Sequence, residues 1–338
     1  MKRTPSLDGL RAISISLVVL GHLTKAGPAP RFLANYAGTG VRIFFVISGY
    51  LITTLLLDEH ARRSTINLRQ FYVRRAYRIL PAAAVFMLFV FVAYWHQLRW
   101  YDIGAMLLYV VNFDGARPWV VAHLWSLSVE EQFYFLWPSV LRKWYRQSVP
   151  ILLGVIVLAP IYSAACYHCK IPNGGYGTFP AVADNLAIGC LLAKFGARLP
   201  RIRPWAALVM LLAVVVIPSY PANTPARTFF MLFVLWPILH CSIAGLVLHA
   251  IQSPYRVLNF APVVWLGRIS YSLYLWQEPF FFNPFRQPAY KLLLGVGLAC
   301  LSYYLVEQPL LRLRDRNPPP SPIGVSESGL VVCEAVQA

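Results

Sequence analysis

Long runs of apolar residues recur along the whole chain, separated by short segments that are rich in arginine. A helix rises about 1.5 Å per residue, so roughly 20 mostly apolar residues are needed to cross a bilayer. Runs of about this length predict ten membrane-spanning helices, at residues 7–23, 38–57, 79–96, 123–141, 149–166, 180–195, 205–219, 229–250, 262–281 and 291–311. The pattern therefore predicts an all-α fold, a polytopic membrane bundle of about ten transmembrane helices.

Two segments are ambiguous in this pattern. The first run contains Asp8, Arg11 and His22 and lacks a small-residue cleavage site, so we interpret it as a retained span and not as a secretory signal. The stretch 100–113 is apolar but short, and we predict a re-entrant or interfacial piece there. A span at 100–113 would invert the side of every later loop.

Composition and charge support a membrane-embedded chain and give it an orientation. Of 338 residues, 58% are hydrophobic and 13% charged, whereas a soluble domain usually has about 25% charged residues. Cytoplasmic loops are enriched in Lys and Arg, and placing both termini inside gives the inner segments roughly twice as many of them. The net charge of +17 is thus explained by orientation and by contact with anionic lipids, without nucleic acid.

The chain divides into a membrane domain, residues 1–312, and a basic, proline-rich tail, residues 313–338, which we predict to be cytoplasmic and disordered. We therefore expect any chemistry to lie in the bundle. Cys166 and Cys169 form a C-x-x-C beside His168. We interpret them as thiols at a span end, and we predict no metal site.

Charged residues inside the first predicted span are candidates for function, because an ionisable group in a bilayer costs several kcal/mol unless it is paired or hydrated. Asp8, Arg11 and His22 fall on one helical stripe with Ile15 and Val18, and we expect this stripe to face the bundle interior. Arg11 and His22 are about three turns, or roughly 16 Å, apart along the axis. The structural alternative is an i,i+3 pair of Asp8 with Arg11, with His22 capping the outer end.

A basic cluster follows the second predicted span. Arg75 and Arg78 are one helical turn apart, so their guanidinium groups can converge on a phosphate. The alternative is a topogenic cluster that contacts lipid head groups, and the residues alone leave both interpretations open. Within the second span, Ser48 and Gly49 indicate close helix packing in preference to chemistry.

The fourth predicted span begins with two adjacent carboxylates, Glu130 and Glu131, which are unsuited to lipid contact. Ser126 stands four residues before Glu130 and His123 seven residues before it, so these three side chains can line one face of a cavity. Three further carboxylates are equally consistent with structural pairing and with chemistry: Asp184, Glu278 and Glu307.

Motifs in the same order along the chain resemble those of the acyltransferase-3 family, bacterial membrane O-acyltransferases that modify O-antigens and other exported glycans. The matching segments are 6–12 with His22, 44–50, 75–78, 123–134, 183–189, 266–276 and 306–309. They cover essentially residues 5–312. The sequence departs from the family pattern at Gln277, where the family usually has histidine.

The resemblance implies an integral membrane enzyme of the bacterial inner membrane. It would transfer an acyl group, most often acetyl, from cytoplasmic acyl-CoA to a hydroxyl of a carbohydrate or glycolipid acceptor. Arg75 and Arg78 would hold the CoA phosphates at the inner mouth, and Arg11 would contact the donor. The resemblance implies no cofactor beyond this donor substrate.

We hypothesise that His22 is the general base for the acceptor hydroxyl, or that it receives the acyl group transiently. Glu130 or Glu131 would orient the imidazole or bind acceptor hydroxyls. The remaining ionisable residues of the matching segments would contact the acceptor or form structural pairs: Asp8, His123, Asp184 and Glu307.

Two other classes of function compete with an enzyme. A transporter or flippase also places ionisable residues near the midplane, but such folds often contain internal repeats, and the two halves of this chain show none. A membrane scaffold would tolerate replacement of its buried charges. Turnover of acyl-CoA by the purified protein discriminates the enzyme from both.

Overall fold

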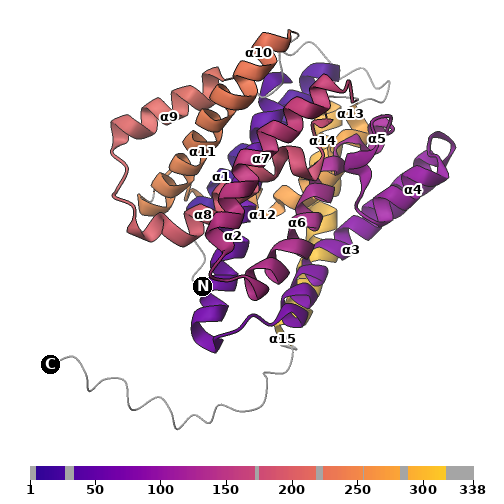
Figure 1. The fold of residues 1–338 in the computed structure, drawn as a ribbon. Coiled ribbons are helices and arrows are strands. Elements are labelled where there is room, and N and C mark those ends of the chain that lie inside the picture. Colours follow the sequence, from indigo (N-terminus) through magenta and orange to yellow (C-terminus); the bar gives the residue numbers. More distant parts are fainter. Residues whose placement is uncertain are drawn as a thin grey trace.

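The computed structural model describes residues 5–26, 34–171, 175–217, 224–253, 255–281 and 288–316. These residues form helices and no strand, as predicted (Figure 1). The helices are α1 (Pro5–Ala26), α2 (Tyr36–Arg63), α3 (Leu68–Tyr94), α4 (Trp100–Leu107), α5 (Trp119–Ala122), α6 (Leu124–Lys143), α7 (Ser148–His168), α8 (Phe179–Phe195), α9 (Pro204–Val216), α10 (Pro225–Phe230), α11 (Trp236–Gln252), α12 (Ala261–Trp276), α13 (Glu278–Phe281), α14 (Pro288–Ser302) and α15 (Gln308–Arg316). Residues 1–4 lie outside this description, as do residues 317–338 of the tail 313–338 that was predicted to be disordered.

Each of the ten predicted spans overlaps helical residues of the structure, although some are divided between two or three consecutive helices. In the described part of the chain, seven helices are long and apolar enough to cross a membrane; α6, α9 and α12 are not among them. The number of ten spans thus stays a prediction. The segment 100–113 forms α4 and a 3-10 turn, Val111–Phe113, as expected for a piece that does not span. The eight residues of α4 rise only about 12 Å.

Two predicted boundaries need correction. Helix α3 begins at Leu68 and not at 79, because the Asn67 side chain caps it by accepting a hydrogen bond from the Gln70 amide at 3.0 Å. Arg75 and Arg78 therefore belong to a helix. The last predicted span continues through a π-helical turn, Tyr303–Glu307, and α15 to Arg316, four residues beyond the predicted domain end at 312.

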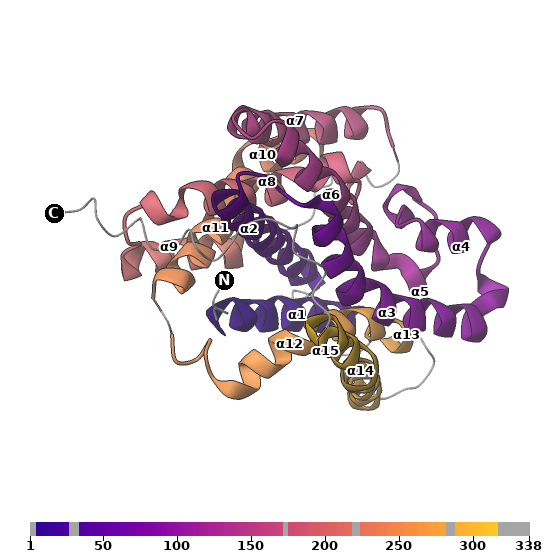
Figure 2. The same ribbon diagram turned by 90° about the horizontal axis from the view of Figure 1, so that it is seen from below.

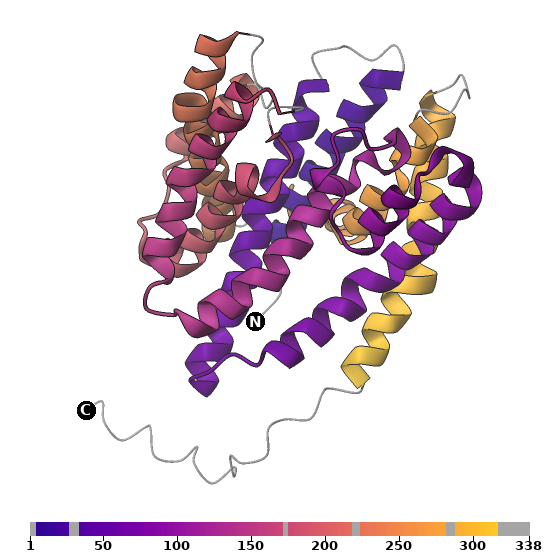
Figure 3. The same ribbon diagram turned by 45° about the vertical axis from the view of Figure 1, so that its right-hand side comes forward.

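Helices α1, α2 and α8 form the centre of the bundle (Figures 2 and 3). Each buries 61% of its most apolar stretch, whereas the spans of α3 and α7 each bury 28%. The outer helices carry exposed apolar side chains, including Leu88 of α3, Val157 of α7 and Leu208 of α9. Such a surface is suited to contact with lipid chains.

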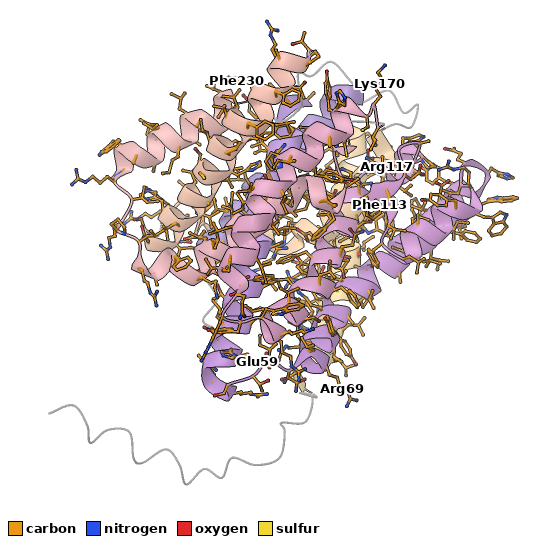
Figure 4. The ribbon with its side chains drawn as sticks, in the orientation of Figure 1. Glu59, Arg69, Phe113, Arg117, Lys170 and Phe230 are labelled. Atoms are coloured by element: carbon orange, nitrogen blue, oxygen red, sulfur yellow. The ribbon has the colours of Figure 1, made fainter. Side chains whose placement is uncertain are left out.

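One end of the bundle, where α2 ends and α3 begins, carries Arg62, Arg63, Arg69 and Arg74, and we call it the arginine-rich end. Glu59 and Arg69 lie at this end in Figure 4, and Lys170 and Phe230 lie at the opposite end. Helix α1 runs away from the arginine-rich end and α2 runs toward it, because Gly21 of α1 packs on Ala37 and Gly40 of α2 packs on the Ser14 carbonyl.

Glycines let α2 and α8 approach until their backbones touch. A Cβ atom added to Gly49 would lie 2.1 Å from the Leu186 carbonyl oxygen, and one added to Gly189 would lie 2.2 Å from the Val46 carbonyl oxygen. The prediction of close packing at Gly49 is confirmed. No flexible side chain can yield at these contacts, so the two helices share one fixed spacing.

A buried charge triad ties α2, α8 and α11 together. The Nδ1 atom of His240 lies 3.0 Å from a carboxylate oxygen of Asp184, and the other ring nitrogen of His240 hydrogen-bonds with Arg42. The Arg42 guanidinium also lies over the Trp236 ring, 4.2 Å from its centroid. Arg42 and His240 are 3% and 1% exposed, so each charge depends on the others for stabilisation.

We predict that replacing Gly49 with valine lowers the stability of the folded bundle by about 3 kcal/mol or more, because α2 and α8 must separate. Thermal unfolding in detergent measures the effect. The matched control is Gly154→Val in α7, since a Cβ atom at Gly154 meets nothing within 4 Å. Equal melting temperatures for the two variants would contradict the packing argument.

We predict that Asp184→Ala destabilises the protein by about 3–5 kcal/mol, because it leaves Arg42 and His240 buried without their carboxylate. The readout is the melting temperature together with the monodisperse fraction on gel filtration. Cys241→Ala, at an exposed position of α11, serves as the control. A fully stable Asp184→Ala variant would show that the triad does not hold the three helices.

Candidate active site

A polar cavity of about 470 Å³ opens between α1, α2, α3, α6, α12 and the C-terminal helix. Helix α1 reaches it because a Cβ atom on Gly267 of α12 would lie only 1.9 Å from the Asp8 carbonyl oxygen, so these two helices touch. We call this cavity the arginine chamber. Its charged lining consists of five arginines and three carboxylates: Arg11, Arg75, Arg78, Arg268, Arg314, Asp8, Glu130 and Glu307.

A second cavity, of about 460 Å³, adjoins the chamber at the arginine-rich end, and we call it the mouth cavity. The tight link between α2 and α3 shapes it: Ser64 adopts a left-handed conformation with φ 54°, and Glu59 accepts the Asn67 amide at 2.9 Å. Both cavities are lined by Arg75, Arg78 and Arg314, and the mouth cavity adds Arg62, Arg63 and Arg74.

Arg75 is held in place and keeps hydrogen-bonding capacity. Its guanidinium lies 4.2 Å from the centroid of the Tyr134 ring, a cation–π contact that fixes the side chain. Its Nε atom is buried and has no hydrogen-bond partner among the described residues. A buried donor of this kind is stabilised by an anion that enters the chamber.

The structure distinguishes the two adjacent carboxylates. Glu130 faces the chamber, where it accepts hydrogen bonds from Ser48 at 2.9 Å and from Tyr134 at 3.0 Å. Glu131 lines neither cavity, and its Oε1 atom is buried without a partner in the described part of the chain. Ser48, which the sequence assigned to packing alone, thus positions a chamber carboxylate.

Beyond Arg11 and Glu130, away from the arginine-rich end, the chamber continues into a narrow cavity of about 50 Å³. Ser126 lines it together with Glu130, as their spacing predicts. The Ser126 hydroxyl and the Tyr274 hydroxyl are 2.6 Å apart, and Tyr274 donates to the His123 carbonyl oxygen. Because this uses the only Tyr274 hydroxyl proton, Ser126 donates to Tyr274.

The two histidines of the predicted site lie outside these cavities. His22 stands three turns beyond Arg11 on α1, is partly buried and lines neither the chamber nor the narrow cavity. His123 also lines neither, against its predicted place beside Ser126, because its ring turns to the Glu278 carboxylate at 2.9 Å. The polar stripe of α1 is confirmed as inward-facing, with Ile15 and Val18 fully buried.

The C-terminal helix forms a wall of the chamber, of which the sequence interpretation had named only Glu307 as a candidate. Tyr303, Glu307, Leu311 and Arg314 line it at helical spacing. Glu307 is 2% exposed and accepts a hydrogen bond from Ser272 at 3.1 Å. The helical spacing of these four residues was the sequence signal that could have predicted this wall. It was overlooked because the residues beyond 312 were assigned to a tail.

Two other positions of interest lie outside the chamber. Asp184 belongs to the separate triad with Arg42 and His240. Gln277, at the position where the family usually has histidine, is 1% exposed, and neither atom of its amide group has a hydrogen-bond partner among the described residues.

Comparison with known proteins agrees with the motifs. The acyltransferase domain model of the acyltransferase-3 family matches residues 4–306. A peptidoglycan O-acetyltransferase of Listeria monocytogenes is 27% identical over 82% of this chain and 49% of its own length. A Bacillus subtilis protein provisionally named as a peptidoglycan O-acetyltransferase is 31% identical over 90% of this chain and 54% of its own length.

A Staphylococcus aureus protein provisionally named as an O-acetyltransferase is 30% identical over 91% of this chain and 57% of its own length. The chain thus spans about half the length of these relatives. No solved structure matches it. Since the family model covers nearly the whole membrane bundle, the chain belongs to the acyltransferase-3 family of multi-pass membrane proteins.

Proposed function

We propose that this protein transfers an acetyl group from acetyl-CoA on the cytoplasmic side to a hydroxyl of a cell-envelope glycan or glycolipid. The names of the relatives support O-acetyl transfer and a carbohydrate acceptor. The arginine-rich end is then cytoplasmic, in agreement with the bias of Lys and Arg toward cytoplasmic loops, and both termini lie on that side of the inner membrane.

The observation that carries this proposal is the pair of cavities joined at Arg75, Arg78 and Arg314. CoA has a long, narrow pantetheine arm and an anionic nucleotide with several phosphates. Guanidinium groups bind phosphates by paired hydrogen bonds. The mouth cavity receives the nucleotide, the shared arginines hold the phosphates, and the arm extends through the chamber toward Arg11 and Glu130.

In the reaction, the bond between the acyl carbon and the CoA sulfur breaks and a bond to the acceptor oxygen forms. The acceptor hydroxyl loses a proton and the thiolate gains one. His22 acts as the general base that takes the hydroxyl proton, or carries the acyl group transiently. Glu130, which Ser48 and Tyr134 hold in place by hydrogen bonds, lies on the side of the bundle from which the donor enters. The acceptor and membrane lipids approach from the opposite end.

We predict that Arg75→Ala and Arg78→Ala each weaken acetyl-CoA binding about 10- to 100-fold, since each removes charge-assisted hydrogen bonds to phosphate. Binding of labelled acetyl-CoA to the purified protein in detergent measures the loss. Arg69→Ala is the matched control, because Arg69 is an exposed arginine of the same helix that lines neither cavity. Equal losses in all three variants would indicate a general charge effect and reject the donor site.

We predict that His22→Ala lowers acetyl transfer about 100- to 10,000-fold and leaves acetyl-CoA binding unchanged, because only the base is removed. Transfer is followed as acetate released by alkali from envelope glycans of cells that express each variant. His168→Ala provides the control, at an exposed histidine of the same end of the bundle. Full transfer by His22→Ala would remove His22 from the mechanism.

A further inference from the structure

The narrow cavity beyond Arg11 and Glu130 has the size, the chemistry and the position of a binding site for the acyl group alone. Its position follows from its lining. Arg11, Phe44, Leu127, Glu130 and Tyr271 line both this cavity and the arginine chamber, so the two spaces adjoin. A donor whose arm fills the chamber would present its acyl end here.

Four residues line only the narrow cavity. Three of them, Val41, Ser126 and Tyr274, lie farther from the arginine-rich end than the shared residues of their helices, and the fourth, Ser270, directly precedes the shared Tyr271. Val41 precedes Phe44 on α2, which runs toward that end, and Tyr274 follows Tyr271 on α12, which runs away from it. The cavity is therefore a continuation of the chamber into the bundle and not a side branch. The hydrogen-bonded pair of Ser126 and Tyr274 forms part of its wall.

The volume of the narrow cavity limits what it can hold. A volume of about 50 Å³ corresponds to roughly four water-sized atoms, at about 10–15 Å³ each. An acetyl group has three heavy atoms and a hexanoyl group has seven. Val41 and Leu127 supply the apolar side walls that a methyl group would contact.

A single polar group in the wall lacks a partner. Ser270 lines the narrow cavity and is 0% exposed, and its hydroxyl has no hydrogen-bond partner among the described residues. A buried hydroxyl in that state costs about 1–3 kcal/mol unless a ligand satisfies it. A thioester carbonyl oxygen can accept a hydrogen bond from this hydroxyl.

We propose that the narrow cavity is an acyl pocket, that Ser270 donates a hydrogen bond to the thioester carbonyl oxygen, and that Val41 limits the acyl group to about four heavy atoms. The proposal rests on the proposed use of acyl-CoA as donor. It adds the size class of the acyl group and the residues that select it.

The test is competition binding to the full-length protein in nanodiscs, so that no acceptor is needed. Labelled acetyl-CoA is displaced by CoA, acetyl-, propionyl-, butyryl- and hexanoyl-CoA. We expect the wild type to bind acetyl- and propionyl-CoA at least tenfold more tightly than hexanoyl-CoA, because each excess methylene in a filled pocket weakens binding about tenfold or more. Val41→Ala is expected to raise the affinity for butyryl-CoA relative to acetyl-CoA about tenfold. The control is Val46→Ala, because Val46 is a buried valine of the same helix that lines neither cavity, and it should leave this affinity ratio unchanged.

Ser270→Ala tests the carbonyl contact separately. It is expected to weaken acetyl-CoA about 5- to 100-fold relative to CoA, which has no carbonyl at this place. The control is Ser128→Ala, because the Ser128 hydroxyl is buried but already donates to the Leu124 carbonyl oxygen. An unchanged ratio of acetyl-CoA to CoA affinity in Ser270→Ala would remove Ser270 from the site.

The outcomes separate this inference from the function it rests on. Equal affinity of the wild type for CoA and for every acyl-CoA overturns the acyl pocket and leaves the donor assignment intact. Absence of binding of any CoA compound overturns the donor assignment and the pocket with it. Gel filtration shows whether the Val41→Ala variant is folded. If it is not, Val41→Thr replaces it in the test: threonine is nearly equal to valine in volume, so this variant should keep the wild-type preference for short acyl groups.

Discussion

The arrangement of this bundle depends on the cost of placing charge away from water. An ion buried in protein loses several kcal/mol of solvation unless a partner or a hydrated cavity replaces the water. Two places in the described part of the chain show two different ways of replacing that water. The triad of Asp184, His240 and Arg42 satisfies its charges internally, whereas the arginine chamber gathers more cations than carboxylates around an accessible space.

Whether a buried charge has a partner within the protein distinguishes a structural group from a functional one more clearly than its burial does. In the triad each charged group has a protein partner, and the Arg42 guanidinium is further covered by the Trp236 ring. In the chamber, Arg75 keeps a buried Nε atom without a partner among the described residues, and the mouth cavity adds further arginines. An excess of buried positive charge is stable when an anion occupies it, which is the state that a phosphate-bearing donor would create.

Apolar periodicity was sufficient to place every predicted span on helical residues and to set apart the short segment 100–113, because a bilayer constrains span length strongly. Helical spacing also placed Arg11 inward and Ser126 beside Glu130. Helical spacing did not predict the features that depend on contacts between different helices. Nothing local distinguishes Glu130 from Glu131, since the choice depends on Ser48 from another helix.

Three further features of the site could be identified only from the folded structure. His123 turns to Glu278 across a gap of 155 positions, which spacing on one helix cannot indicate. The early start of α3 follows from one capping side chain, Asn67. Arg314 joins the chamber because the helix continues past the last apolar run, where composition alone indicates a tail.

The distance between the narrow cavity and His22 has a consequence for the proposed transfer across the bundle. His22 stands three helical turns beyond Arg11 on α1, roughly 16 Å along the helix axis, so under the proposed function an acyl group held beside Arg11 would have to move farther into the bundle before His22 could act on it. The hydrogen-bonded pair of Ser126 and Tyr274 lines the narrow cavity on that side. The pair is joined by hydrogen bonds and not by interlocking apolar side chains. Each such bond contributes about 0.5–1.5 kcal/mol net, so breaking the two bonds of Tyr274 costs about 1–3 kcal/mol.

An acceptor that binds with micromolar affinity supplies about 8 kcal/mol, several times this cost. Breaking the hydrogen bonds of Tyr274 would therefore be well within the free energy that such an acceptor could supply under the proposed function.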